Sequence, residues 1–413
     1  MTATIFTARR IITMNGYRPL AQAVLVRDGR IVAVGTVEEC QGWGEANVDD
    51  RFADKVLMPG MVEAHGHSAE GVFLDFPYVG YYDVPRPDGS IAKGVRSYDE
   101  LLEVLRAADA ALEPGETLVA NAFDPIYFAG QERLSKEHLD QVSTTRPIFV
   151  RHASGHLATV NTAMLVAEGI AKDTQTPGVD LGDDGEPSGE LQEAPAMALA
   201  KSAAEPLMKA NSDPQGLVDY GRLCRNAGVT TTSELAGLMI IAAAQADMFD
   251  SVVNDPSFPA PVSVYNVPGI PGVPADYAAA ATAARALAER NTDKLRLGGI
   301  KLIGDGSLQG WTACCSHPGY FTGEDHGLAQ FTDDDLNLAV KTFHEAGLQI
   351  FCHANGDASA DQFINAVDLA LRDYAWLDHR HTVQHSQVTR AAQYRRMATL
   401  GIAANIFTNH IWY

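Results

Sequence analysis

The sequence lacks the features of several specialised protein classes. It has no run of about 18 apolar residues, so we expect no membrane span. Its first residues, MTATIFTARRIITMNGYRPL, lack the basic-then-apolar layout and the small-residue cleavage site of a signal peptide, and we expect a cytoplasmic protein. Only five cysteines occur, without paired spacing, which indicates neither a disulfide framework nor a thiolate metal site.

Positive charge is also scarce. The chain has 31 Lys and Arg against 52 Asp and Glu, a net charge of −21. Nucleic acid and anionic lipid would be repelled at long range, so we expect neither as a partner and leave a homodimer open. A chain of 413 residues is long enough for a large barrel or for two domains.

The first part of the chain reads as β structure. Residues 4–58 contain short alternating or apolar runs broken by turns, and in AQAVLVRDGRIVAVG the letters RDG are a hairpin signal between β-branched runs. We therefore predict a small N-terminal β region.

After residue 58, predicted strands alternate with predicted helices. Residues 97–115 form a predicted helix with Ser97 as N-cap, and residues 332–347 another with Thr332 as cap and Gly347 past its end. Seven strands are predicted, at residues 55–61, 146–154, 229–235, 296–307, 348–357, 380–388 and 402–407. Such alternation implies parallel pairing and favours a (β/α) barrel or a doubly wound sheet.

Candidate functional residues lie at the carboxyl ends of these predicted strands: His65 and His67 on the first, His152 and His156 after the second, Glu234 on the third, Lys301 on the fourth, His353 on the fifth and His385 on the sixth. In a parallel barrel these ends share one rim. His65 and His67 are two residues apart and point to the same side of a strand, so both can reach one ion. Imidazole suits zinc and similar ions.

Each signal has a structural alternative. An isolated histidine at a strand end is more often a hydrogen-bonded loop or core residue than a ligand, and the chain has 13. The joint placement on several strand ends is what favours metal binding. Lys301 lies within the apolar run GGIKLIG, where a buried ammonium would be costly unless paired. Phe123, Tyr127, Phe128 and Trp311 indicate either an apolar pocket or core packing.

A set of motifs resembles a known family. VLMPGMVEAHGHS resembles the metal-binding start of the amidohydrolase superfamily. Six further stretches are similar to its amidohydrolase-3 (YtcJ-like) group, which includes N-substituted formamide deformylase: RHASGHLATVNTAML, DGEPSGELQEA, GVTTTSEL, GIKLIGDGSLQGWTA, FCHANGD and TVQHSQ. The motifs occur in the family's order over essentially the whole chain, so as a set they are specific.

The resemblance implies a site and a fold. It makes His65, His67, Lys301, His353 and His385 ligands of one or two divalent ions, with zinc expected and iron, manganese or cobalt as alternatives. It implies carboxylation of Lys301, catalytic roles for Lys301, His385 and His156, and substrate contacts from Arg151, His156, Glu193, Asp305 and Trp311. Glu234 stands where family members often have an acid after a histidine, and here Ser233 precedes it. The implied fold is a (β/α)8 TIM-type metal-dependent hydrolase barrel at residues 59–413, with residues 1–58 as part of a composite β-sandwich.

The implied activity is hydrolysis of a non-peptide C–N amide bond in a small molecule, an N-substituted formamide or N-acyl amine, by metal-activated water. Two alternatives stay open: a catalytically silent scaffold, and a related metallohydrolase acting on a lactone, cyclic amide or phosphoester. In the family an eighth strand carries a metal-binding aspartate, and residues 386–413 contain no Asp or Glu. We therefore expect this chain to be a fragment that ends before strand 8 and that lacks catalysis by itself.

Overall fold

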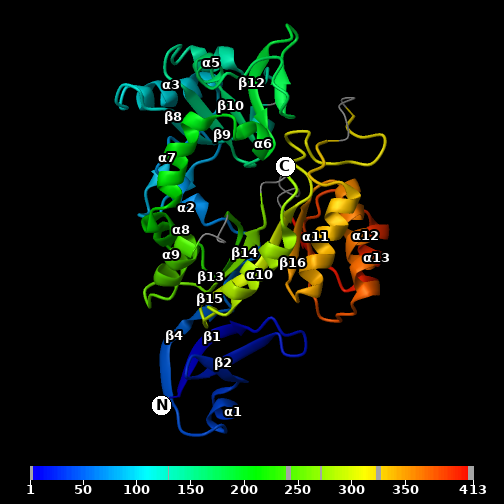
Figure 1. Cartoon of the computed structure of the whole chain (residues 1–413). Coiled ribbons are helices and arrows are strands. Elements are labelled where there is room, and N and C mark those ends of the chain that lie inside the picture. The colour runs from blue at the N-terminus through cyan, green and yellow to red at the C-terminus, as the bar shows by residue number, and fades with distance from the viewer. Residues whose placement is uncertain (1–2, 129, 239–242, 270–271, 322–326, 408–413) are drawn as a thin grey trace. The chain divides into compact units, whose positions relative to one another are not determined.

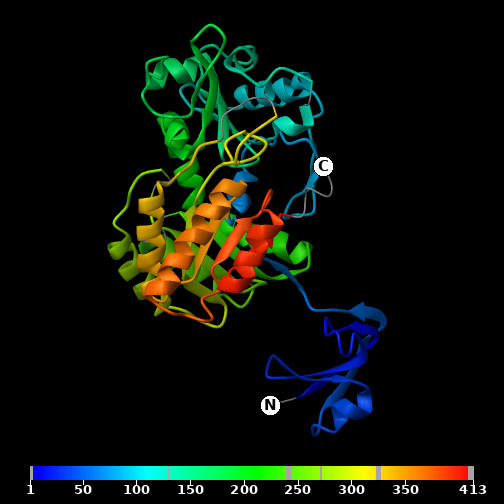
Figure 2. The same cartoon turned by 90° about the vertical axis from the view of Figure 1, so that its right-hand side faces the viewer.

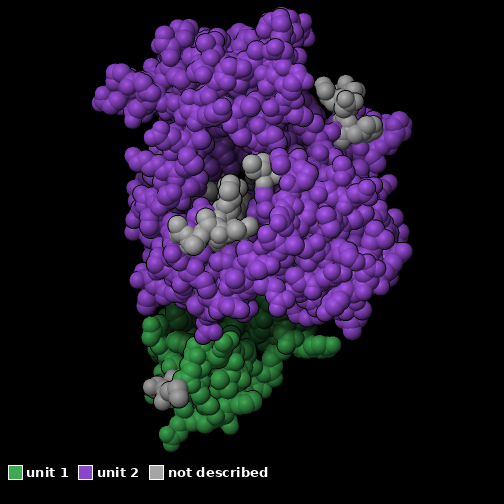
Figure 3. Space-filling view, viewed as in Figure 1, with its two compact units in different colours: residues 1–62 green, residues 63–413 purple. Residues whose placement is uncertain are grey.

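The computed structural model describes residues 3–128, 130–238, 243–269, 272–321 and 327–407. The chain divides into two compact units, residues 1–62 and residues 63–413 (Figure 3). The main sheets of the two units are separate and are described in turn.

The first unit contains a four-stranded sheet in the order β3-β2-β1-β4. Its elements are β1 (Thr4–Ile12), β2 (Leu20–Arg27), β3 (Arg30–Gly35), α1 (Val37–Gln41) and β4 (Asn47–Leu57). Ile5, Leu25 and Cys40 are completely buried in its small core. The predicted β region is therefore confirmed. The described residues of this unit form a single sheet, so the composite β-sandwich stays a prediction.

The predicted hairpin is present between β2 and β3. Arg27 pairs with Arg30, and the two residues between them, Asp28 and Gly29, have φ values of 53° and 71°. Both are left-handed, as a two-residue type I′ turn requires, and glycine adopts this conformation without a steric cost.

The second unit contains a seven-stranded sheet in the order β18-β17-β16-β15-β14-β13-β5. Its strands are β5 (Met61–Glu63), β13 (Val229–Leu238), β14 (Val262–Val267), β15 (Leu295–Ile303), β16 (Ile350–Ala354), β17 (Thr382–His385) and β18 (Ala403–Ile406). Every pair from β13 to β18 is parallel. The predicted parallel pairing is confirmed.

Helices follow the strands of this sheet and pack beside it (Figures 1 and 2). They are α8 (Pro214–Asn226), α9 (Ala243–Val253), α10 (Tyr277–Ala288), α11 (Asp333–Glu345), α12 (Asp357–Asp373) and α13 (Ala391–Leu400). Helix α11 begins as predicted, because the Thr332 side chain accepts a hydrogen bond from the Asp335 N–H. Phe343 of α11 and Phe363 of α12 are completely buried in the largest core cluster, together with Ile350 of β16.

Between β5 and β13 the chain forms a second sheet, with the order β11-β12-β10-β9-β8. Its strands are β8 (Leu118–Phe123), β9 (Ile148–His152), β10 (Leu157–Val160), β11 (Val179–Leu181) and β12 (Pro187–Gln192). The same region contains a two-stranded ribbon, β6 (Val84–Pro85) with β7 (Ile91–Ala92), a 3₁₀ turn (Pro125–Phe128), and the helices α2 (Ala69–Phe73), α3 (Tyr98–Asp109), α4 (Lys136–Asp140), α5 (Thr162–Glu168), α6 (Glu193–Met197) and α7 (Lys201–Asn211).

This second sheet corrects one prediction. The strand at 146–154 was expected to be the second strand of the parallel sheet, but β9 pairs with β8 and, in antiparallel fashion, with β10. A short turn at Ser154 and Gly155, with a φ of 74° at the glycine, returns the chain directly to β10. The seven-stranded sheet instead contains β14, which lies between β13 and β15 and whose Val262 and Val264 are buried.

The seven-stranded sheet curls until its two edge strands approach each other. Asn405 of β18 donates a hydrogen bond of 3.2 Å from its side-chain nitrogen to the carbonyl oxygen of Ala64, the residue after β5. Residues that follow strands far apart in the sheet order can therefore reach one place. Among the described residues, no helix has the length and apolar character needed to cross a bilayer.

Candidate metal and active site

The four histidines predicted to bind metal lie together in one cluster. His65 and His67 follow β5, His353 is in β16 and His385 ends β17. The ring centroids of His65 lie 5.1 Å from His67 and 4.3 Å from His385, and those of His353 and His385 are 4.4 Å apart. The four rings form a continuous chain of contacts at the carboxyl ends of these strands.

His385 joins this cluster through an unusual backbone conformation. Consecutive residues of a strand point to opposite faces, so Gln384 and His385 would ordinarily diverge. His385 and Ser386 have φ values of 70° and 50°, in the left-handed region that residues other than glycine seldom adopt. The turn at this strand end brings the His385 ring against His353. Such strained backbone is frequently found at functional sites.

Three histidines of the cluster have lowered pKa values. Burial, with smaller contributions from the neighbouring Lys301 and His67, lowers the pKa of His65 to about 2. Burial also lowers the pKa of His353 and of His385 well below the ordinary value. These three imidazoles are therefore neutral near pH 7, and neutral imidazole is the form that binds metal ions.

Lys301 lies beside the same cluster. It is 2% exposed, and its Nζ has no hydrogen-bond partner among the described residues. Burial lowers its pKa to about 7, while Cys352 and Glu234 act in the opposite direction. Ile303 is the register partner of His353, and Lys301, two residues earlier on β15, points to the same face of the sheet.

The donor set suits a cation. His67 Nδ1, His385 Nε2 and Lys301 Nζ are buried without hydrogen-bond partners in the described part of the chain, and buried polar atoms are rarely left in that state. Among these residues, no three His, Cys, Asp or Glu side chains are already arranged around one point as ligands. The chemistry of the residues therefore fits a metal ion, and their side chains must adjust to enclose one.

Glu234 lies closer to this cluster than the sequence indicated. It is 2% exposed, accepts a hydrogen bond from the Ser68 N–H, and has its Oε1 3.7 Å from His67 Nδ1. Burial raises the pKa of this carboxyl, but the nearby His67 and the hydrogen bond from Ser68 together outweigh burial and lower it. A carboxylate is thereby held beside His67.

The second sheet contributes a histidine and a carboxylate. His156 Nδ1 donates to Glu193 Oε2 at 2.8 Å, and the His156 ring centroid is 4.7 Å from that of His353. Glu193 has a φ of 65°, and its main-chain N–H donates to the carbonyl oxygen of His156. Its Oε1 is buried without a hydrogen-bond partner in the described residues. The His156–Glu193 pair therefore adjoins the histidine cluster.

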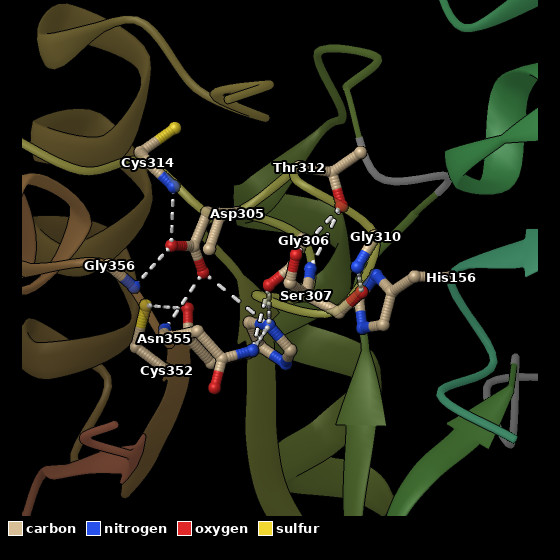
Figure 4. A network of polar contacts seen from close by, with 12 residues as sticks. His156, Asp305, Gly306, Ser307, Gly310, Thr312, Cys314, Cys352, Asn355 and Gly356 are labelled. Carbon is tan, nitrogen blue, oxygen red and sulfur yellow. Dashed lines mark hydrogen bonds and ion pairs between the residues drawn. The ribbon is translucent and has the colours of Figure 1, made fainter. Parts of the chain in front are cut away.

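Asp305 is the centre of a network that fixes the loops beside His353 (Figure 4). Its carboxylate accepts main-chain N–H groups from Cys314, Asn355 and Gly356 at 3.0, 3.0 and 2.8 Å. Asp305 is completely buried, and its Oδ1 is 3.4 Å from His353 Nε2. With its oxygens occupied in this way, Asp305 joins the loop after β15 to the residues that follow His353, and its role toward substrate stays a prediction.

Comparison with known proteins agrees with this arrangement. Residues 53–412 match the family model Amidohydro_3, described as the amidohydrolase family. The chain belongs to this amidohydrolase family. Membership places it among hydrolases, and the resemblance recognised in the sequence is confirmed.

The amidohydrolase chain is similar to proteins that cover most of its length. It is 26% identical to N-substituted formamide deformylase of Arthrobacter pascens over 94% of this chain and 70% of that protein. It is 23% identical to the putative amidohydrolase YtcJ of Bacillus subtilis, over 96% and 71%. A crystal structure of an uncharacterized metal-dependent hydrolase from Pyrococcus horikoshii has a TM-score of 0.65 and 16% identity, over 99% and 75% of the two chains. With the curled parallel sheet, this likeness fits a TIM-type fold.

Two further predicted contact residues of the amidohydrolase lie in the second sheet and the loop that follows β15. Arg151 donates from Nη1 to Asn121 Oδ1 at 3.0 Å and stacks on Phe73, with 4.2 Å between its guanidinium carbon and the ring centroid. Trp311 is 38% exposed and stacks against Arg133 at 4.4 Å. Trp311 thus offers an open ring surface, whereas Arg151 is already engaged by neighbouring side chains. Their roles toward substrate stay predictions.

Phe123, Tyr127 and Phe128, which could have lined an apolar pocket, pack in a hydrophobic core cluster instead. Phe123 is completely buried, Phe128 is 3% exposed, and Tyr127 packs against the cluster that they share with Leu101 and Leu105.

Two amides at the site were not found from the sequence. Gln384 accepts from His65 Nδ1 at 2.7 Å, and Asn355 Nδ2 lies 3.0 Å from His353 Nε2. Gln384 precedes His385 in VQHS, and Asn355 is two residues after His353 in CHANG. These motifs do not indicate which histidine ring each amide will contact.

Proposed function

We propose that this amidohydrolase cleaves a non-peptide C–N amide bond in a small molecule, using water activated by one or two divalent metal ions. The observation that carries the proposal is the continuous cluster of four histidine rings beside a buried lysine whose Nζ has no hydrogen-bond partner in the described residues. The proposed ligands are His65, His67, Lys301, His353 and His385, and zinc is the expected ion because imidazole nitrogen is among its preferred ligands.

Lys301 is proposed to act as a carbamate. Its Nζ is buried without a counter-ion hydrogen-bonded to it in the described residues, and a pKa of about 7 leaves much of the amine neutral. A neutral amine adds to carbon dioxide by forming an N–C bond and releasing a proton to solvent. The product is an anion with two oxygens, which can ligate metal where a free ammonium cannot.

The residues around the cluster have separate proposed roles. A divalent ion at this position supplies a coordinated water whose pKa falls from about 16 to about 7, and polarises the substrate carbonyl. His156, held by Glu193, lies against His353 and is assigned to hydrogen-bond the developing oxygen anion. Glu234, beside His67, is assigned to take up the proton released from water.

The proposed substrate class is an N-substituted formamide or N-acyl amine. The name of the Arthrobacter pascens relative describes deformylation of N-substituted formamides, and similarity over 94% of this chain supports the same class of bond. A metallohydrolase acting on a lactone, cyclic amide or phosphoester would share the same ligands, and a silent scaffold would share only the fold.

The test combines metal analysis with a substrate panel. We expect the purified protein, expressed to the end of its native reading frame, to contain zinc or a similar ion and to hydrolyse members of a panel of N-formyl and N-acyl amines in preference to cyclic amides, lactones and phosphoesters. A protein without metal or turnover would support the silent scaffold. Preference for a phosphoester or lactone would overturn the C–N assignment.

A matched pair of variants separates ligand loss from general damage. His385→Asn should lose metal and activity. His381→Asn removes a completely buried histidine four residues earlier, which is hydrogen-bonded to His344 and Ile350 instead of the cluster. It should lower stability and keep the metal stoichiometry. Equal metal loss in both variants would contradict the assignment of His385.

A further inference from the structure

A chain of four hydrogen-bonding groups connects the far edge of the sheet to His65. Asn405 Nδ2 donates to the carbonyl oxygen of Ala64 at 3.2 Å and to Gln384 Oε1 at 2.8 Å. Gln384 Oε1 also meets His65 Nδ1 at 2.7 Å. These contacts bring together β18, β17 and the segment after β5.

The chemistry of these groups fixes the direction of every bond. A backbone carbonyl can only accept, so the Asn405 amide must present its nitrogen to Ala64. The same nitrogen also donates to Gln384, so the Gln384 side chain must present its oxygen, Oε1, as the acceptor. That oxygen cannot donate, so the proton between it and His65 belongs to Nδ1. His65 is thereby set in one tautomer, with its Nε2 lone pair free.

Strand register holds Gln384 in place. Gln384 pairs with His353 on β16 and with Asn405 on β18, and register partners on parallel strands point to the same face of the sheet. Gln384 is completely buried. The amide therefore lies in the same row as a proposed ligand, His353, and its oxygen accepts from another, His65.

We propose that Gln384 is a positioning residue that holds His65 with Nε2 as the metal-binding atom, and that Asn405 fixes the orientation of the Gln384 amide. This inference rests on the proposed metal centre and adds two residues that do not themselves bind the ion. Partners of this kind set the tautomer and ring orientation of a histidine ligand, and their loss typically weakens metal binding by about 10- to 100-fold.

The alternative is that Gln384 only fills the interior of the sheet. A matched control separates the two. Gln393 is also buried, at 2% exposure, and its amide also makes two hydrogen bonds, to the Asp357 carbonyl oxygen and from the Arg390 N–H. Gln384→Leu and Gln393→Leu thus remove comparable buried amides, but only the first contacts a proposed ligand.

The experiment measures Zn²⁺ affinity of the full chain by competition with a chromophoric chelator, and the visible absorption of the Co²⁺-loaded protein. We expect Gln384→Leu to bind Zn²⁺ about 10- to 100-fold more weakly and to change the Co²⁺ spectrum. Gln393→Leu should lower stability alone. Gln384→Glu, which keeps an acceptor for His65 Nδ1, should restore affinity to near the wild-type value. If Gln384→Leu does not fold, Asn405→Ala, at a partly exposed position, should weaken binding in the same direction.

The outcomes distinguish this role from the proposed function. If wild-type protein binds no divalent ion, the metal centre and the role of Gln384 both fail. If wild-type protein binds Zn²⁺ and the Gln384→Leu variant, or Asn405→Ala in its place, binds it equally well, the positioning role alone is overturned. Equal weakening by Gln393→Leu would also overturn it, because the effect would then be a general loss of stability.

Discussion

Gly306 offers a direct test of the contact between the second sheet and the loop after β15. A Cβ built on Gly306 would lie 2.1 Å from Glu193 Oε1 and 2.1 Å from Thr312 Oγ1. Real contacts of this kind are essentially never shorter than 3.0 Å, so both side chains must retreat by about an ångström. Glu193 is 4% exposed, and the Thr312 hydroxyl accepts the Ser307 N–H at 2.9 Å, so neither can move freely.

The expected consequence of Gly306→Ala is loss of the His156–Glu193 hydrogen bond, which is 2.8 Å long. A hydrogen bond to a charged group contributes about 1.5–3 kcal/mol. If His156 stabilises the transition state as proposed, a loss of that size lowers kcat/KM by about 10- to 100-fold, since each 1.36 kcal/mol is tenfold in rate.

The assay is steady-state hydrolysis of the best substrate from the panel, with thermal unfolding measured in parallel. Gly16→Ala is the control, because a Cβ there meets nothing within 4 Å. It should leave kcat/KM and stability unchanged. Wild-type kcat/KM in a stably folded Gly306→Ala protein would refute the reasoning, since the predicted displacement of Glu193 would then have no effect on the chemistry.

Three further predictions concern metal, acid and thiol chemistry. Removal of divalent ions by dialysis against a strong chelator should abolish hydrolysis, and added Zn²⁺ should restore it; unchanged turnover in metal-free protein would contradict the proposed function. Folded His381 stays neutral because burial lowers its pKa to about 2, whereas the unfolded residue takes up a proton below 6.5, so stability is lost as the pH falls through this window. From about pH 7.5 to about pH 5.5 the free energy of unfolding should drop by about 1.4 kcal/mol more in wild type than in His381→Asn, as measured by urea unfolding, and equal slopes would be evidence against it. Burial raises the pKa of Cys314 to about 12, so mass spectrometry after brief alkylation of native protein should find the half-buried Cys315 modified before Cys314, and the reverse order would show that the buried thiol is accessible.

Much of the site follows from the sequence because parallel strands share an end. His65, His67, His353 and His385 could be brought together by that rule alone, and the structure does place them in one cluster. The rule needs only the order and direction of strands. It does not need the exact register. The grouping of the four histidines therefore holds even though the strand at 146–154 was wrongly predicted to belong to the parallel sheet.

Contacts that depend on register or on backbone strain could not be predicted. Gln384 reaches His65 only because β17 and β18 are aligned so that it stands opposite Asn405. The position of the His385 ring depends on a left-handed backbone φ at this residue, which no pattern of residue types predicts. The strand β14 was missed because VSVYNV, although its apolar residues alternate as in a strand, carries no residue that suggested chemistry.

The contact between His65 and Gln384 joins residues 319 positions apart. A ribosome adding roughly 5–20 residues per second needs roughly 16–60 s to pass from one to the other. During that interval His65 has left the ribosome without Gln384, the partner proposed to set its tautomer, and the β5 segment has no neighbouring strand of this sheet until β13 is made. We therefore expect metal acquisition to be a late event in the biogenesis of this protein, and ribosome-bound chains stalled before residue 384 should retain far less Zn²⁺ than chains stalled after the β18 segment has emerged.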